Sequence, residues 1–117
     1  MRHQKKLKKI GLPKDHRTAL LRNLVASLVL HERIQTTQSR AKALASRFDR
    51  VMSLVKRKET REAIRTVAQY CTIEAASRKL VGELKGRYEN RTSGFTRITR
   101  VGMRKGDNAK LVQIELL

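Results

Sequence analysis

Cationic side chains are the most numerous charged groups in this chain of 117 residues. There are 28 Lys and Arg residues against 10 Asp and Glu, so the formal net charge is +18. Arg outnumbers Lys by 16 to 12, and a planar guanidinium can engage two phosphate oxygens at once. Like charges on a compact body repel one another, and a dense polyanion relieves that repulsion. The charge therefore predicts a nucleic-acid partner.

The cations gather in two parts of the chain. From Met1 through Arg33 there are nine Lys and Arg residues, offset only by Asp15 and Glu32. An ordinary soluble surface mixes both signs, so this imbalance calls for an external counter-charge. Phe95, beside the second cluster, could stack on an unpaired base, although packing in the core is the favoured interpretation. The second cluster consists of Arg97, Arg100, Arg104 and Lys105.

Catalytic and metal-binding groups do not converge in the sequence. It contains no HExxH motif, nucleophile elbow or closely spaced pair of carboxylates. The loop with Gly102, Lys105 and Gly106 lacks the Gly-Lys-Ser/Thr end of a P-loop and leads into a strand. Cys71 is the single cysteine, and a buried small hydrophobe is its expected role. We expect no enzyme activity, no metal, no cofactor and no small-molecule substrate.

The first cluster is expected to lie on an arm and a helix. Residues 1–14 carry six cations and no acid and have few apolar groups, which predicts an extended basic arm. Asp15 is a suitable N-cap for a helix that runs to about His31, because apolar residues recur three and four apart from Leu20. Its opposite face is polar and carries Arg17, Arg22 and Asn23.

Further elements follow from the pattern in the middle of the chain. Residues 33–37 are β-prone and predict a short strand, after which Thr37 can cap a helix from Gln38 to about Lys58. The spacing predicts a third helix over 60–70 and a fourth from Thr72 to the Gly86 region.

The C-terminal part changes from helical to extended character. Residues 95–101 and 111–117 predict two strands, joined by a loop with turn residues at Gly106-Asp107-Asn108. If Gly106 holds a positive φ, it is required for that turn. The early strand must join this hairpin to cover its own edge. The sequence thus predicts a single α+β domain over residues 15–117, preceded by the arm.

The chain is short and has no apolar run long enough to cross a bilayer and no secretory signal. We therefore expect a soluble, intracellular protein without a membrane partner. Composition alone leaves three classes open: a component of a ribonucleoprotein, a DNA-compacting or regulatory protein, and an RNA-modifying enzyme.

Several short motifs resemble one family along essentially the whole chain, in order and spacing: Met1-Arg2-His3, His16-Arg17, Arg22-Asn23-Leu24, Thr36-Thr37, Ala41-Lys42, Gly94-Phe95-Thr96-Arg97-Ile98 and Gly106-Asp107-Asn108-Ala109. Together they resemble bacterial-type large-subunit ribosomal protein 17. Two positions depart from the usual pattern, since Ser93-Gly94-Phe95 replaces Gly-Gly-Tyr and Lys110 replaces a proline.

The resemblance implies an α+β protein with a small mixed three-stranded sheet that binds large-subunit ribosomal RNA near the polypeptide exit region. It also implies neighbouring ribosomal proteins as partners and a ribosome in the cytoplasm, or an organellar ribosome of bacterial descent. The arm, the first helix and the hairpin loop are expected to contact the RNA. The expected RNA-binding residues are Arg2, His3, Lys5, Lys6, Lys8, Lys9, Lys14, His16, Arg17, Arg22, Asn23, Thr36, Thr37, Arg40, Lys42, Arg97, Arg100, Arg104 and Lys105.

Overall fold

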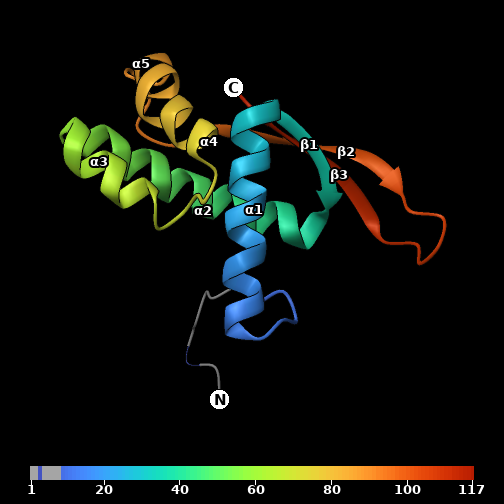
Figure 1. The fold of residues 1–117 in the computed structure, drawn as a ribbon. Coiled ribbons are helices and arrows are strands. Elements are labelled where there is room, and N and C mark those ends of the chain that lie inside the picture. Colours follow the sequence, from blue (N-terminus) through green and yellow to red (C-terminus); the bar gives the residue numbers. More distant parts are fainter. Residues whose placement is uncertain (1–2, 4–8) are drawn as a thin grey trace.

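The computed structural model describes His3 and residues 9–117 (Figure 1). Four of the predicted RNA-binding residues, Arg2, Lys5, Lys6 and Lys8, lie outside the described residues. The described end of the arm forms a turn, in which the Leu12 amide donates to the Lys9 carbonyl at 3.2 Å. The division into an arm of residues 1–14 and a domain of residues 15–117 stays a prediction.

The first helix, α1 (Lys14–His31), has the predicted end but a different start. Pro13 occupies the N-cap position and no side chain caps the helix, so the expectation that Asp15 is the cap is wrong. Proline cannot donate from its own nitrogen and suits a helix start. Asp15 instead lies in the first turn, where its negative charge interacts favourably with the positive end of the helix dipole.

Glu32 ends α1 and joins four elements. Its φ of 63° is left-handed, and its amide donates to the Leu28 carbonyl at 2.8 Å. Its carboxylate accepts hydrogen bonds from Lys79 and Arg87, each at 3.0 Å, and these bonds lower the pKa of Glu32 below its usual value. Its carbonyl accepts from the Leu116 amide at 2.9 Å. One residue therefore fixes α1 against the later helices and the last strand.

Strand β1 (Arg33–Thr37) leads directly into helix α2 (Gln38–Arg57), as predicted. Thr37 stands at the N-cap position, but its side chain makes no capping hydrogen bond. The apolar face of α2 is fully buried from Ala41 to Val55. This face forms much of the core, together with Val25, Leu28 and Val29 of α1.

The chain continues through short helices, which Figure 1 places to one side of α1, where α2 also extends. These are α3 (Thr60–Val67), α4 (Glu74–Lys79), a π-helical turn η1 (Leu80–Leu84) and α5 (Lys85–Arg87). The single fourth helix expected from Thr72 is thus three consecutive segments. Leu80 and Leu84, at the two ends of the π turn, both lie in the core.

Strands β2 (Thr96–Met103) and β3 (Lys110–Leu116) form the predicted hairpin. The sheet order is β1-β3-β2, so β1 covers an edge of the hairpin strand β3. Both pairings are antiparallel, which corrects the expectation of a mixed sheet. The register aligns Ile34, Ile114 and Ile98 across the three strands. The α+β class and the order of elements are confirmed.

Three aromatic rings join the helices to the sheet. Phe95 is fully buried and packs edge-on against Phe48 of α2 at 6.5 Å and against Tyr88 at 5.2 Å between ring centroids. The Tyr88 hydroxyl donates to the Leu117 carbonyl at 3.0 Å, and burial raises the pKa of Tyr88. Phe95 is therefore a core residue, and its alternative role as a base-stacking platform is excluded by its burial. Cys71 is buried, as predicted.

Candidate nucleic-acid interface

Two parts of the molecule extend from the helical body, and together they carry eight of the 19 predicted site residues. The first half of α1 runs outward to the N-terminal end of the described chain, and the β2-β3 hairpin extends sideways beyond the helices (Figure 1). The core begins only at Leu21, so the first turns of α1 contribute little to it.

The exposed start of α1 presents Lys14, His16 and, half-buried, Arg17, while Asn23 is exposed further along the helix. Arg22 differs from these residues, because its Nε donates to the Gln69 carbonyl at 2.9 Å. That hydrogen bond fastens α1 to the segment between α3 and α4. Arg22 therefore has a structural task that its position on the polar face did not predict.

A groove brings together three segments that are distant in the sequence. It has a volume of about 520 Å³ and receives Ile10 from the arm, the start of α2, and both ends of the hairpin turn. We call it the junction groove; its lining residues are Ile10, Thr37, Gln38, Ser39, Arg40, Arg104, Asp107, Ala109 and Lys110. Of the predicted site residues, Thr37, Arg40 and Arg104 thus meet in one place.

The start of α2 makes the junction groove attractive to an anion. The first turn of this helix contains no acid, and no side chain caps its free amides. Unpaired amides and the helix dipole together favour negative charge at a helix N-terminus. Arg40 and Lys110 are exposed at the rim. Lys110 was not among the predicted residues, and it is the residue at the position where the related pattern has a proline.

The hairpin turn is held by an ion pair. Arg104 donates from Nε to Asp107 Oδ1 at 2.9 Å and from its terminal nitrogen to Oδ2 at 2.6 Å. These bonds, with one from the Ala109 amide, lower the pKa of Asp107 to about 2. The positive φ of the turn lies at Asn108, at 56°, and not at Gly106. The carboxylate thus neutralises Arg104 locally and leaves Lys105 as the unpaired cation at the tip.

Arg97 and Arg100 lie on β2, which is an edge strand of the sheet. Arg97 lies 3.9 Å from the Glu115 carboxylate in a weak pair, in which the arginine is exposed and the glutamate half-buried. Arg100 is exposed. Thr36 and Lys42 flank the start of α2, where Thr36 is half-buried and Lys42 exposed.

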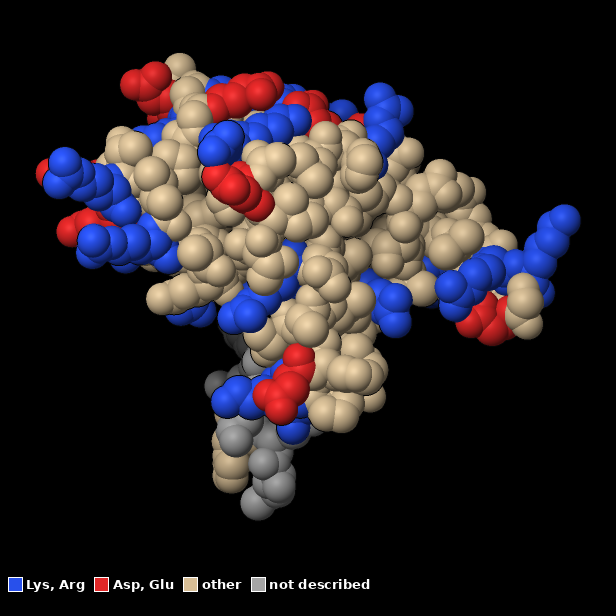
Figure 2. Space-filling view, in the orientation of Figure 1, with Lys and Arg blue, Asp and Glu red and all other residues tan. Residues whose placement is uncertain are grey.

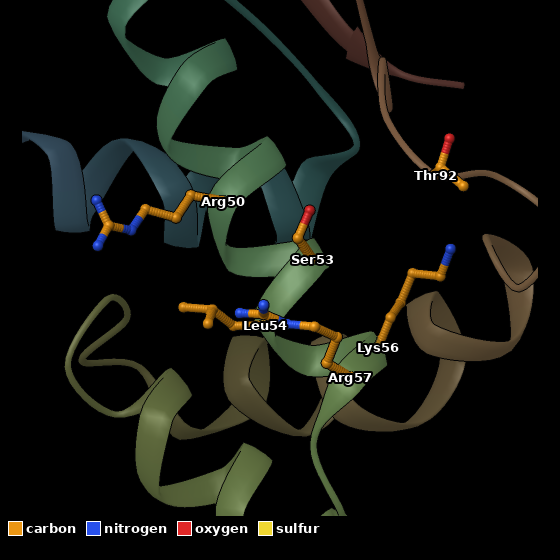
Figure 3. A pocket seen from close by; sticks show the side chains of 6 residues that line it. All are labelled: Arg50, Ser53, Leu54, Lys56, Arg57 and Thr92. Atoms are coloured by element: carbon orange, nitrogen blue, oxygen red, sulfur yellow. The ribbon is translucent and has the colours of Figure 1, made fainter.

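A second groove lies on the outer side of α2 and was not predicted. It has a volume of about 580 Å³ and is lined by Arg50, Ser53, Leu54, Lys56, Arg57 and Thr92 (Figure 3). Lys56 extends toward Thr92 and donates to the Arg91 carbonyl, whereas Arg50 extends to the other side of Ser53. We call it the α2 groove. Its cations could have been recognised from their spacing on the predicted helix.

Acidic residues are unevenly distributed. Figure 2 shows acidic side chains gathered on one face over the short helices, and cationic ones at the hairpin tip and along the lower edge of the body. Residues 59–90 hold five of the ten acidic residues. In the part of the chain that the structure describes, no group of three His, Cys, Asp or Glu residues could hold a metal ion. No described helix is long and apolar enough to cross a membrane.

Comparison with known proteins identifies relatives along almost the whole chain. The chain is 44% identical over 110 residues to "Large ribosomal subunit protein bL17" of Desulforudis audaxviator, covering 94% of this chain and 97% of that protein. It is 42% identical to the Clostridium kluyveri protein of the same name, covering 94% and 96%. A sequence model of the family described as "Ribosomal protein L17" matches residues 20–117. These matches confirm the resemblance seen in the motifs, and the chain belongs to the ribosomal protein L17 family.

Proposed function

We propose that this protein binds large-subunit ribosomal RNA through phosphate contacts made by the arm, the exposed start of α1, and the junction groove beside the hairpin. Family membership makes it a structural protein of the large ribosomal subunit in the cytoplasm, and not an enzyme. Composition left three classes open, and family membership confirms the first of them, a component of a ribonucleoprotein. The RNA contacts themselves are the proposal.

The junction groove is the observation that carries the proposal. Arm, helix start and hairpin are far apart in the sequence, and they meet at this groove: the arm contributes Ile10, the helix start contributes Arg40 and free amides, and the hairpin contributes Lys110. The only acid in the lining, Asp107, is already neutralised by Arg104. An RNA phosphate at the start of α2 would therefore meet uncompensated positive charge from Arg40 and Lys110 and the positive end of a 20-residue helix.

The predicted site residues take different parts in this proposal. Lys9, Lys14, Arg17 and Lys105 hold phosphates as unpaired cations, and Arg40 does so inside the groove. Arg22 and Arg104 shape the surface through their bonds to Gln69 and Asp107. The residues proposed to lie within reach of RNA, without a more specific assignment, are Arg2, His3, Lys5, Lys6, Lys8, His16, Asn23, Thr36, Thr37, Lys42, Arg97 and Arg100.

On the strength of the family resemblance alone, we extend the proposal to a location near the polypeptide exit region with other ribosomal proteins as neighbours. The near-neutral helices over residues 59–90 are the surface offered to such proteins, because their charges nearly balance and they present exposed Ile64 and Ile73. A density map of the assembled large subunit tests this location. Placement of the protein away from the exit region would refute it.

Ultraviolet crosslinking in purified large subunits tests the RNA contacts. We expect crosslinked peptides to come from the arm, from residues 14–17 and from the junction groove. Peptides from residues 59–90 serve as the internal control and should carry few or no RNA adducts. Adducts confined to residues 59–90 would contradict the proposal. Release of the protein from the sedimenting particles of a cell extract by DNase, and not by high salt, would also contradict it.

A further inference from the structure

Four arginines follow one side of α2 at regular spacing. Arg40 and Arg47 are seven residues apart, as are Arg50 and Arg57, and all four fall within about 100° of arc on a helix with 3.6 residues per turn. At 1.5 Å per residue they extend over about 25 Å. The apolar residues that fill the core occupy the adjacent sector of α2. We call this set the α2 arginine stripe.

The stripe has no acidic partner among the described residues. Arg40, Arg50 and Arg57 are exposed and form no ion pair there, while Arg47 is half-buried with its guanidinium 4.9 Å from the centroid of the Tyr70 ring. Asp49 is the only acid in α2, and it accepts a hydrogen bond from the Phe95 amide at 3.3 Å. On the helix it lies outside the stripe, about 80° from Arg57 and about 100° from Arg50. The Asp49 carboxylate is therefore bonded to the backbone just before β2, and the positive charge of the stripe is left uncompensated.

The stripe continues the junction groove. Arg40 lines that groove, and Arg50 and Arg57 line the α2 groove further along the same helix (Figure 3). The α2 groove is lined by three cationic side chains, two hydroxyl side chains and Leu54, and by no acid. A row of guanidinium groups along one side of a helix suits a series of phosphates.

We propose that the α2 arginine stripe binds the phosphodiester backbone of one RNA segment, which enters at the junction groove and follows α2 as far as Arg57. Contacts of this kind fix the position of an RNA helix without reading its bases. This inference rests on the proposed RNA-binding function, and it assigns to that function three arginines that the sequence patterns did not identify: Arg47, Arg50 and Arg57.

A salt titration with purified large-subunit ribosomal RNA tests the stripe. The test variant carries Arg50→Gln and Arg57→Gln, and the control carries Arg61→Gln and Arg65→Gln on α3. Both pairs are exposed and without an ion pair among the described residues, and both changes remove two positive charges. Each lost phosphate contact lowers the slope of log affinity against log salt by about 1. We expect a slope about 2 shallower for the stripe variant and little change for the control.

Three results would overturn the inference. Equal slopes for the stripe variant and the wild type would show that no phosphate lies there, and equal losses in both variants would reduce the effect to net charge. Poor incorporation of the stripe variant into subunits with unchanged binding to free RNA would indicate an acidic protein partner. If the wild type itself fails to bind large-subunit RNA, the proposed function fails first. Thermal unfolding of both variants checks that they are folded.

Discussion

The helices between residues 59 and 90 and the rest of the chain differ in how their charges are balanced. The helical segment holds six cationic and five acidic residues, whereas the remainder holds 22 cationic and five acidic ones. Three of the six cations in the segment form ion pairs: Arg78 with Glu74, and Lys79 and Arg87 with Glu32 at the end of α1. Elsewhere most of the described cations form no ion pair. The comparison indicates that the charges of the helical segment nearly balance, whereas the rest of the chain carries the excess positive charge that requires a polyanion.

The core joins the two regions, so a substitution in the core should have the largest effect on the stability of both. Phe95 contacts Phe48 in the cationic region and Tyr88 in the balanced one. Removing this buried ring by Phe95→Ala should lower the free energy of unfolding by roughly 3–5 kcal/mol. Chemical denaturation measures this loss. An unchanged unfolding free energy would show that the ring does not hold the two regions together.

The arm tests the cationic region alone. Changing Arg2, Lys5, Lys6, Lys8 and Lys9 to Gln should make the salt dependence of RNA binding shallower by up to about 5 in the log-log slope, at about 1 per phosphate contact. The melting temperature should hardly change, because the described core begins at Leu21. A large fall in melting temperature would show that the arm belongs to the folded domain and not to the interface.

Glu32, at the end of α1, tests the attachment of the balanced region to the rest of the chain. Glu32→Gln removes the charge that pairs with Lys79 and Arg87, so the melting temperature should fall while RNA affinity stays the same. Because the folded-state pKa of Glu32 is lowered, its contribution is present above its unfolded pKa of about 4.3 and is lost as the pH falls further. The difference between the melting temperatures of variant and wild type should therefore shrink in acid.

Glu74→Gln is the matched control for Glu32→Gln. It breaks the pair with Arg78, in which both side chains are more than three-quarters exposed, and such pairs contribute little. Its melting temperature should stay close to that of the wild type. Equal effects of the two variants would mean that Glu32 acts only through general charge and not as a link between elements.

The smallest expected effect lies at the hairpin tip. Asp107 should titrate with a pKa of about 2, because Arg104 and the Ala109 amide stabilise its charged form. The ion pair contributes above the unfolded pKa of about 3.9 and is lost as the pH falls through about 2. A carbon-detected NMR titration measures this pKa. In the Arg104→Gln variant it should rise toward 3.9, and no rise would show that the pair does not form in solution.

The sequence predicted the elements best where local signals are strong. The C-terminal ends of α1 and α2 follow from uninterrupted apolar spacing. The hairpin follows from β-branched runs around turn residues. The π turn at Leu80–Leu84 was missed, because helical periodicity allows either winding and only packing selects one. The bonds of Arg22 and Arg104 were missed for a similar reason, since composition counts a cation as free until its partner is known.

The candidate site was partly predictable. The residues of the arm and α1 are recognisable from local charge, but the junction groove requires three distant segments to meet, and no local pattern gives that contact. The α2 arginine stripe is different, because its spacing is visible in the predicted helix. A count of charges along the chain does not reveal the stripe, because the four arginines share one side only when the chain is wound into a helix of 3.6 residues per turn.

The central place of β3 in the sheet has a consequence for biosynthesis. The two outer strands, β1 and β2, pair only with β3, and β1 leaves the translating ribosome about 75 residues before β3 does. Until β3 emerges, the backbone of β1 has no sheet partner, and the core face that the sheet covers stays open. The helices can associate early during synthesis, but the sheet closes late. The cationic N-terminal segments are thus free to meet RNA before the domain that carries them is complete.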